Sequence, residues 1–481
     1  MSHNGAGRVL AIGLDATESS LVERMIDAGE LPALQSLLAR GTWSRVTSPT
    51  GFSAGAVWPS FSTGLPACDH GQYSIWNWDP ARMHLAYTGE TRPTPFWKDL
   101  AETGATVGVL DVPFAPFVGL EAGFEVTEWG AHSSIDGHVS ASPRAVAEVV
   151  KQFPPHPFAD PLATVPYDPA DVPGFLDSCM EGLRLRGDLA ERLIVERRPD
   201  LSLVVFEEAH HCGHFLWHTV EPDLPLYADV PAVARPTTTL PDLYREMDRQ
   251  VGRLVEAAGA DATVLVFALH GMGPARGLPP VLEPVLAGLG MTHVLEGVNR
   301  HSVRDAIKRR VPSALRDLYR KSVPLARRSQ WGKSGILPAY DWPRTKAFAL
   351  PYEQYGNIRI NLAGREAEGI VPPAEYDETC ALIERALRAL RTVDGRPVVE
   401  DVVRPPRGSH AAGLPDLVAH WHPAVFESPA CVNGVEILNI RREQTGQHHW
   451  DGFCIESGPS AAVGPLSGED VQGRILAALG R

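Results

Sequence analysis

The sequence predicts an α/β protein with a mainly parallel central sheet and helices on both of its faces. Short apolar segments rich in Val, Ile and Leu alternate along the chain with longer amphipathic segments. Continuous apolar strands separated by helices are typical of a parallel sheet that is covered on both sides. We expect buried strands over residues 9–14, 106–110, 201–206, 263–269 and 417–420.

The amphipathic segments between these strands predict the covering helices. Apolar side chains at helical spacing indicate one face packed on the sheet. We expect helices over residues 20–40, 144–153, 177–196, 240–258 and 376–391, and further strand-like pieces over 357–362 and 453–456. Pro-rich segments at 153–173 and 222–239 predict long loops.

Length and composition limit the domain organisation. A chain of 481 residues permits up to three domains. We expect a single domain over residues 1–481, with a helical basic insertion at 285–345 that interrupts the alternation of strands and helices. A hydrophobic content of 44% with 21% charged residues excludes global disorder. The apolar runs are too short to span a bilayer, so we expect no transmembrane segment.

The charge is unevenly distributed along the chain. Its net value is −14, which argues against binding of a nucleic-acid polymer. Residues 300–333 hold eleven basic and two acidic residues, which leaves 33 basic and 56 acidic residues elsewhere. Three interpretations of this segment remain open: a solvated insertion, a positive lid over an anionic substrate, and attachment to an anionic membrane surface or a partner.

Cysteine usage and the N-terminal sequence predict a cytoplasmic protein. The six cysteines are scattered and form no CxxC pair, so we expect no disulfide framework. The first residues, MSHNGAG, have no basic flank and do not resemble a cleaved signal. The sequence says nothing about the oligomeric state.

Polar side chains follow several of the predicted strands. Asp15 ends the first strand, and His270 follows the segment 263–269. His210 and His214 follow a third strand at helical spacing, and His448 precedes the last strand. Ligands of parallel sheets bind at the carboxyl ends of the strands, so this pattern indicates a metal-dependent hydrolase. A helix cap at Asp15 and structural roles for the histidines are the alternatives.

A serine lies in a loop of small residues between the first two of these groups. Ser53 stands in GFSAGAVWPSFSTG, where its hydroxyl would be accessible in a tight turn, although most loop serines are structural. The sequence contains neither a Walker A loop nor a GxGxxG motif after the first strand.

Together these motifs resemble the alkaline phosphatase superfamily, in its type I phosphodiesterase/nucleotide pyrophosphatase branch. The matching pieces are GLDATE, WPSFSTGLPACDHG, the HxxxH after a strand, LHGMG, INLAGREAEGIV and HHWDGFCIESGP, which span residues 8–459. The resemblance implies an alkaline-phosphatase-like core with insertions. It also implies two metal ions, usually zinc, that flank a Thr or Ser nucleophile.

Carried over by position, the resemblance implies that one ion binds Asp15, Ser53 and His270. Ser53 is the implied nucleophile when Val57 is taken as an inserted residue. Leu269 stands where the family usually has an aspartate, so this site lacks one carboxylate. Glu207 or Glu208 reaching in would compensate, although solvent or backbone contacts are the alternative for both.

The second implied site consists of His210, His214 and His448. His210 stands where the family often has an aspartate, so the site becomes three imidazoles, which suits zinc with an open fourth position. The neighbouring residues His211, Cys212 and His449 are expected to pack beside the ligands or orient them rather than bind metal.

Two further residues are predicted to contact the substrate. Trp76 in YSIWNWDP would stack on a base or ring, with simple packing as the alternative. Arg365 would contact phosphate, with a structural salt bridge as the alternative.

The predicted function is hydrolysis of small-molecule phosphoesters by a serine nucleophile, most specifically of the phosphodiesterase or nucleotide pyrophosphatase type. The expected cofactor is Zn²⁺, as one or two ions, with Mn²⁺ as the substitute. The alternative is a one-metal or metal-depleted homologue that acts as a phosphomonoesterase, a transferase or a non-catalytic binding protein. A sulfatase is disfavoured because the sequence has no CxPxR-type motif.

Overall fold

The structure is a computed structural model, which describes residues 7–48, 52, 54–87, 93–130, 138–158, 166, 169–295, 337–351, 355–408, 410–439, 444–457 and 464–481. Ser53 and the whole basic segment 300–333 lie outside these residues. The structural descriptions below refer to the described part of the chain.

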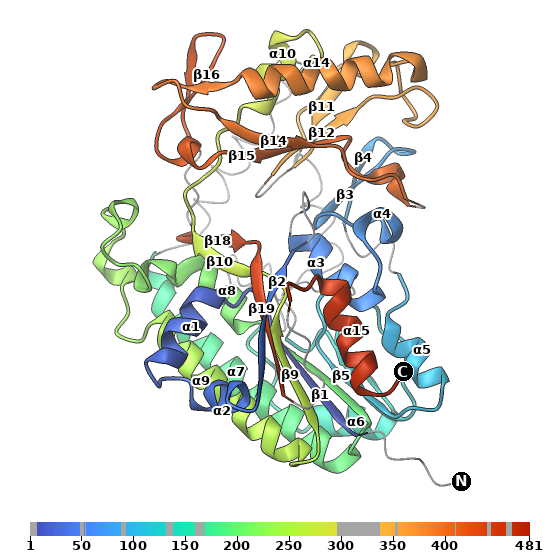
Figure 1. Cartoon of the computed structure of the whole chain (residues 1–481), viewed down its shortest axis with the longest axis vertical. Coiled ribbons are helices and arrows are strands. Elements are labelled where there is room, and N and C mark those ends of the chain that lie inside the picture. The colour runs from blue at the N-terminus through green and yellow to red at the C-terminus, as the bar shows by residue number, and fades with distance from the viewer. Residues whose placement is uncertain are drawn as a thin grey trace, which may run out of the picture.

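An eight-stranded sheet forms the larger part of the molecule (Figure 1). Its order is β2-β19-β9-β1-β8-β5-β6-β7, and the five central strands from β9 to β6 run parallel. β19 is antiparallel to both β9 and β2, and β7 is antiparallel to β6. The bounds are β1 Val9–Leu14, β2 Gly41–Thr47, β5 Val107–Leu110, β6 Gly123–Thr127, β7 Ser140–Ser142, β8 Leu201–Phe206, β9 Thr263–Ala268 and β19 Asp451–Ser457.

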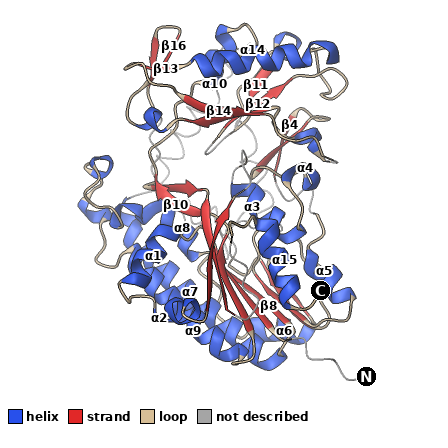
Figure 2. Cartoon of the chain, viewed as in Figure 1, coloured by secondary structure: helices blue, strands red, loops and turns tan. Residues whose placement is uncertain are grey.

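Helices cover both faces of this sheet, which confirms the predicted fold class (Figure 2). The apolar core on one face takes side chains from α1 Ser19–Asp27, α2 Pro32–Leu38, α6 Arg144–Val150, α7 Val172–Arg197, α8 Glu208–Leu216 and α9 Leu240–Ala258. The core on the other face takes them from α3 Ala54–Thr63, α5 Phe96–Glu102 and α15 Gly468–Ala478. Double cover explains why β1, β8 and most of β9 are apolar without alternation.

The helix predicted over 20–40 is two helices. α1 ends before Gly29, whose φ of 72° lies in the left-handed region, and α2 begins at Pro32. Glycine adopts this backbone conformation at low cost, and proline is favoured in the first helical turn but not in a helix interior. Both residues interrupt an apolar period that continues across the break.

A second, antiparallel sheet lies at the other end of the molecule in the view of Figure 1. Its order is β11-β12-β15-β14, with α10 and α14 packed on one side. The bounds are β11 Ala347–Ala349, β12 Gly356–Ile360, β14 Val399–Val403, β15 Leu417–Trp421, α10 Leu282–Gly288 and α14 Tyr376–Ala389. A smaller sheet beside it contains β13 Arg391–Thr392, β16 Ala430–Val432 and β17 Val435–Ile437.

The prediction that 417–420 belongs to the parallel sheet is wrong. β15 pairs antiparallel with β12 and β14. The second sheet is also covered on both sides, since Ala347 and Leu417 join the α14 core whereas Phe348 packs into a cluster with Tyr73. Double cover produces a continuous apolar run whichever way the neighbouring strands run.

Two hairpin-like pairs and one short helix complete the description of the elements near the site. β10 Gly271–Pro274 pairs antiparallel with β18 Gly446–His449, and β3 Trp76–Asp79 pairs with β4 His84–Tyr87. α4 is Ala67–His70. Among the described residues, no helix has both the length and the apolar character needed to cross a membrane.

Candidate metal centre

The polar residues predicted at the carboxyl edge of the sheet come together there. Asp15 follows β1, α8 follows β8 and carries His210 and His214, and His270 follows β9. The β10–β18 pairing places His448 opposite Met272, two residues after His270. Four segments that are far apart in the sequence therefore contribute to one cluster.

The imidazoles of this cluster face one another through their Nε2 atoms. The Nε2 of His210 lies 3.1 Å from the Nε2 of His214 and 3.0 Å from the Nε2 of His448. Ligand atoms of His210, His270 and His448 all lie within 4.8 Å of one another, and His210 and His270 are buried. His270, which the resemblance assigned to the other ion, thus lies in the same cluster.

The outer nitrogens determine the tautomers of two of these rings. His214 Nδ1 lies 3.1 Å from the carbonyl oxygen of Gly446, which only accepts, so Nδ1 carries the proton. His210 Nδ1 lies 2.6 Å from Asp15 Oδ2 and donates to that carboxylate. In the neutral rings both Nε2 lone pairs then face each other across 3.1 Å.

This donor set fits a metal ion. Neutral imidazoles whose second nitrogen donates to a carboxylate or a carbonyl are the usual form of metal-binding histidine. Zn²⁺ prefers a tetrahedral set of such nitrogens and in catalytic sites keeps one position open. The residues that would hold the ion are His210, His214 and His448, with His270 beside them.

Trp58 is a residue of the site that the sequence analysis missed. Its indole Nε1 donates to Asp15 Oδ1 over 2.7 Å, and the ring is buried. Trp58 lies on α3, so this bond joins α3 to the end of β1. The residue stands in a segment with a clear apolar pattern, where nothing local distinguishes a packed tryptophan from one that donates to a distant carboxylate.

A buried ion network holds the N-terminal end of α8. Arg186 Nε donates to Glu208 Oε1 over 2.9 Å, Arg186 Nη1 to Asp111 Oδ2 over 2.6 Å, and Arg186 Nη2 to the carbonyl of Gly130. His156 Nε2 lies 3.1 Å from the same oxygen of Glu208. Burial opposes ionisation of Glu208, but the charge of Arg186 and the hydrogen bonds outweigh it, so the pKa of Glu208 is lowered.

This network bears on the prediction that Glu207 or Glu208 replaces the missing carboxylate. Oε1 of Glu208 is bound to Arg186 and His156, which makes Glu208 an anchor of α8. Glu207 is buried at the N-cap of α8. A contribution of Glu207 to a metal site stays a prediction.

The remaining histidines of the HHCGHFLWH segment and of β18 take other contacts. His218 lies beyond the end of α8 and contacts Thr445 Oγ1 and the carbonyl of Ala234. The His211 ring packs 4.2 Å from that of Phe158, and His449 Nδ1 lies 4.0 Å from Glu18. Neither joins the group of converging nitrogens, as expected for residues beside the ligands.

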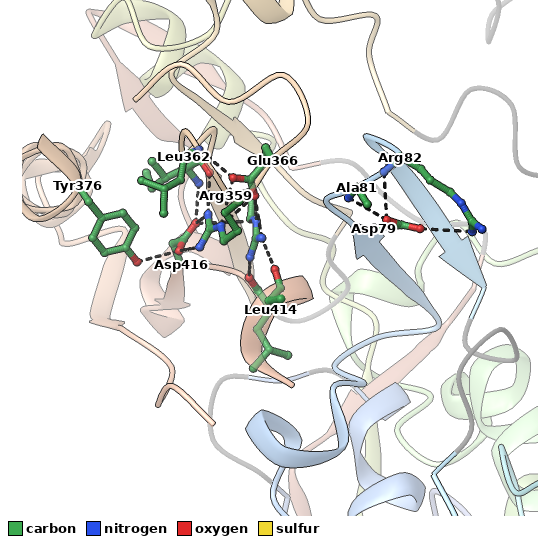
Figure 3. A network of polar contacts seen from close by, with 12 residues as sticks. Asp79, Ala81, Arg82, Arg359, Leu362, Glu366, Tyr376, Leu414 and Asp416 are labelled. Carbon is green, nitrogen blue, oxygen red and sulfur yellow. Dashed lines mark hydrogen bonds and ion pairs between the residues drawn. The ribbon is translucent and has the colours of Figure 1, made fainter. Parts of the chain in front are cut away.

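Arg365 belongs to a buried polar network of the second sheet (Figure 3). Its Nη1 and Nη2 donate to the two oxygens of Asp416 over 2.7 Å each, and its Nε donates to Glu366. The neighbouring Arg359, labelled in Figure 3, also pairs with Glu366. The contacts favour the salt-bridge alternative over the phosphate contact, because four of the five N–H groups of Arg365 already have acceptors in the protein.

Trp76 lies on β3, opposite Tyr87 of β4. It is half-buried and packs against the cluster that contains Tyr73 and Phe348. This packing corresponds to the structural alternative, and stacking on a substrate stays a prediction.

Fold and site together define an α/β hydrolase with a histidine-rich centre at the carboxyl edge of its sheet. The sequence profile of the family named type I phosphodiesterase / nucleotide pyrophosphatase matches residues 9–425. The chain therefore belongs to this family, within the alkaline phosphatase superfamily, and it is a phosphoester hydrolase. A search of curated protein sequences returns no significant match.

Comparison with solved structures supports the same fold. Phosphonoacetate hydrolase from Sinorhizobium meliloti 1021, in complex with phosphonoacetate, is similar with a TM-score of 0.51 and 17% identity, over 98% of this chain and 96% of that chain. Human ectonucleotide pyrophosphatase / phosphodiesterase 5 has a TM-score of 0.47 and 13% identity, over 98% and 95%.

Proposed function

We propose that this protein is a metal-dependent phosphodiesterase or nucleotide pyrophosphatase-type hydrolase with Ser53 as its nucleophile. The observation that carries the proposal is the convergence of His210, His214 and His448 beside Asp15 at the carboxyl edge of the sheet. The proposed cofactor is Zn²⁺, which Mn²⁺ can replace. A bound divalent ion would supply Lewis-acid polarisation of the phosphoryl group.

The position of α3 supports Ser53 as the nucleophile. α3 begins at Ala54, directly after Ser53, and its Trp58 is bonded to Asp15 in the centre. Trp58 lies four residues after Ala54, about one helical turn away. A helix N-terminus also favours an anion such as a phosphoryl group, because its backbone N–H groups are not used within the helix.

The proposed reaction proceeds through a phosphoserine. Ser53 Oγ forms a bond to phosphorus while the bond from phosphorus to the leaving oxygen breaks, and the departing alcohol takes up the proton of the serine. Water then attacks phosphorus from the side that the alcohol has left, and Ser53 Oγ regains a proton. Asp15 contributes by holding the Nδ1 proton of His210.

Substrate preference and metal content test the proposal. Zinc-reconstituted protein is assayed with p-nitrophenyl phosphate, bis(p-nitrophenyl) phosphate and p-nitrophenyl sulfate. We expect the diester to give the highest kcat/KM, and the wild type to lose activity on chelation and regain it with Zn²⁺ or Mn²⁺. A preference for the sulfate would overturn the proposal.

Ser53→Ala tests the nucleophile. The substitution should lower kcat by several orders of magnitude, because the covalent intermediate cannot form, while zinc binding to the three histidines survives. Ser62→Ala on α3 is the control, since Ser62 bonds the carbonyl of Pro59 within the helix. Full activity of Ser53→Ala would assign the role to another group.

The second candidate is a one-metal or metal-depleted homologue with phosphomonoesterase, transferase or binding activity. Leu269 favours it, because this buried apolar side chain supplies no ligand at a position where the family usually has one. Higher kcat/KM for the monoester, or transfer of phosphate to an added alcohol, would establish this candidate.

We also propose that the substrate is a small molecule, that no nucleic-acid polymer is bound and that the protein is cytoplasmic. The single-domain organisation over 1–481 and the basic insertion at 285–345 stay predictions. Fractionation of cells with a specific antibody tests the location, and an activity comparison of Arg309→Glu/Arg310→Glu with wild type tests the lid. Unchanged kinetics on an anionic substrate would contradict a lid.

A further inference from the structure

We infer that the centre holds a single divalent ion on His210, His214 and His448, and that Asp15 orients His210 instead of binding a second ion. This inference rests on the proposed metal dependence and deepens it. It also assigns a positioning role to Trp58. The family resemblance implies a different arrangement, in which Asp15 is a direct ligand of a second ion.

The first argument is the hydrogen bonding of Asp15. Its side chain is buried, and each carboxylate oxygen has a protein donor: His210 Nδ1 at 2.6 Å and Trp58 Nε1 at 2.7 Å. The indole N–H has no other protonation state near neutral pH, so it permanently faces Oδ1. A carboxylate bonded to the outer nitrogen of a metal-binding histidine is the usual orienting partner of such a ligand.

The second argument is the apolar surroundings on the side of Asp15 that faces α3. Leu269 and Trp58 belong to the same buried core cluster, together with Phe267. This packing is close, because a Cβ added to Gly13 would lie 2.7 Å from Cη2 of Trp58. An aspartate is thus replaced by apolar packing that continues to the indole bonded to Asp15.

The third argument is the position of His270. Its nitrogens lie within 4.8 Å of ligand atoms of His210 and His448, whereas its Nδ1 is 3.8 Å from Asp15 Oδ1. His270 therefore lies beside the three-histidine group. Among the described residues, the protein ligands of a separate second ion are reduced to Asp15, which already has two donors, and His270.

Metal stoichiometry tests the inference without an activity assay. The full-length protein is stripped with chelator, reconstituted with excess Zn²⁺, desalted and analysed by inductively coupled plasma mass spectrometry. One zinc per chain is expected. Two per chain would overturn the inference and leave the proposed function standing, whereas no zinc would overturn both. One zinc without hydrolysis of any phosphoester would contradict the proposed function only.

Asp15→Asn separates an orienting role from a ligand role. We expect one zinc per chain at saturation with a Kd raised about 10- to 100-fold, the usual effect of losing an orienting partner. The visible spectrum of the Co²⁺-substituted variant should keep its tetrahedral band, and His448→Ala should lose it. Loss of a whole zinc equivalent in Asp15→Asn would show direct ligation instead.

Trp58→Phe tests the second donor. It removes the N–H bonded to Asp15, so the zinc Kd should rise about tenfold, by analogy with other orienting groups. Trp97→Phe is the matched control, because Trp97 is equally buried in the same core cluster. Thermal unfolding of the metal-free variants measures the packing loss separately. An equal change of Kd in both variants would contradict the positioning role, and Asp15→Asn remains decisive if Trp58→Phe does not fold.

Discussion

Buried histidines in this protein have different protonation behaviour because their partners differ. His210 donates to the carboxylate of Asp15, whereas His70 has two neutral partners. The backbone N–H of Gln72 donates to His70 Nδ1, so the His70 Nε2–H faces Ser60 Oγ, 3.0 Å away. Burial lowers the pKa of His70 to about 4, although Asp69 acts in the opposite direction.

The pKa of His70 predicts acid sensitivity. Because the folded-state pKa of this base is below its ordinary value of 6.5, His70 stabilises the fold fully above pH 6.5. That contribution, about 3 kcal/mol, is lost as the pH falls from 6.5 through about 4. We expect the difference in unfolding free energy between wild type and His70→Gln, measured with urea, to shrink over this range. A difference that does not change with pH would contradict the assignment.

At the scale of elements, the centre depends on how α8 and β18 are held. α8 carries His210 and His214, and its first residue, Glu208, is bonded to the buried Arg186 of α7. The carbonyl of Gly446 in β18 receives the His214 proton. Neither contact involves a neighbour in the sequence, so the direction of both ligands is set by tertiary packing.

Arg186→Met should destabilise the protein by about 3 to 5 kcal/mol, because it leaves the buried carboxylates of Glu208 and Asp111 without their cation. The same variant should bind zinc more weakly, since α8 loses its anchor. Arg192→Met is the control on the same helix, where the exposed pair with Glu196 is worth about 0 to 1 kcal/mol. Urea unfolding measures both, and equal losses in the two variants would contradict the prediction.

Gly446→Ala should displace β18 from α8. An added Cβ would lie 2.0 Å from the carbonyl oxygen of Gly213, which is backbone and cannot rotate away. We expect the zinc Kd to rise at least about tenfold, as when other orienting contacts of a ligand are lost. Gly473→Ala on α15, where the added Cβ meets nothing within 4 Å, should leave Kd unchanged. Isothermal titration with Zn²⁺ gives both values.

For the whole molecule, the histidine cluster is a junction between distant parts of the chain. Its members follow β8 and β9 or lie on β18, and β18 leads directly into β19 at the edge of the large sheet. An ion held there would join segments more than 200 residues apart. Its binding free energy would therefore add to the stability of the whole folded chain.

Zinc should accordingly raise the unfolding free energy by about 2.7 kcal/mol at a free concentration of 100 times Kd. Chelation should remove this increment, as measured by the thermal midpoint with and without EDTA. His448→Ala should show no zinc-dependent shift, because one of the three ligands is lost. A zinc-dependent shift of wild-type size in this variant would place the ion elsewhere.

By itself, the sequence determined the α/β class, four of the five strands assigned to the large sheet, and the histidines that meet at its edge. These features follow from local patterns: apolar runs, helical spacing, and polar residues directly after strands. Only the tertiary structure decided that β15 pairs in a separate sheet, that His218 turns away to Thr445, and that Trp58 bonds Asp15. Strand partners and hydrogen-bond partners are chosen across hundreds of residues, and the residues next to each group in the sequence carry no record of that choice.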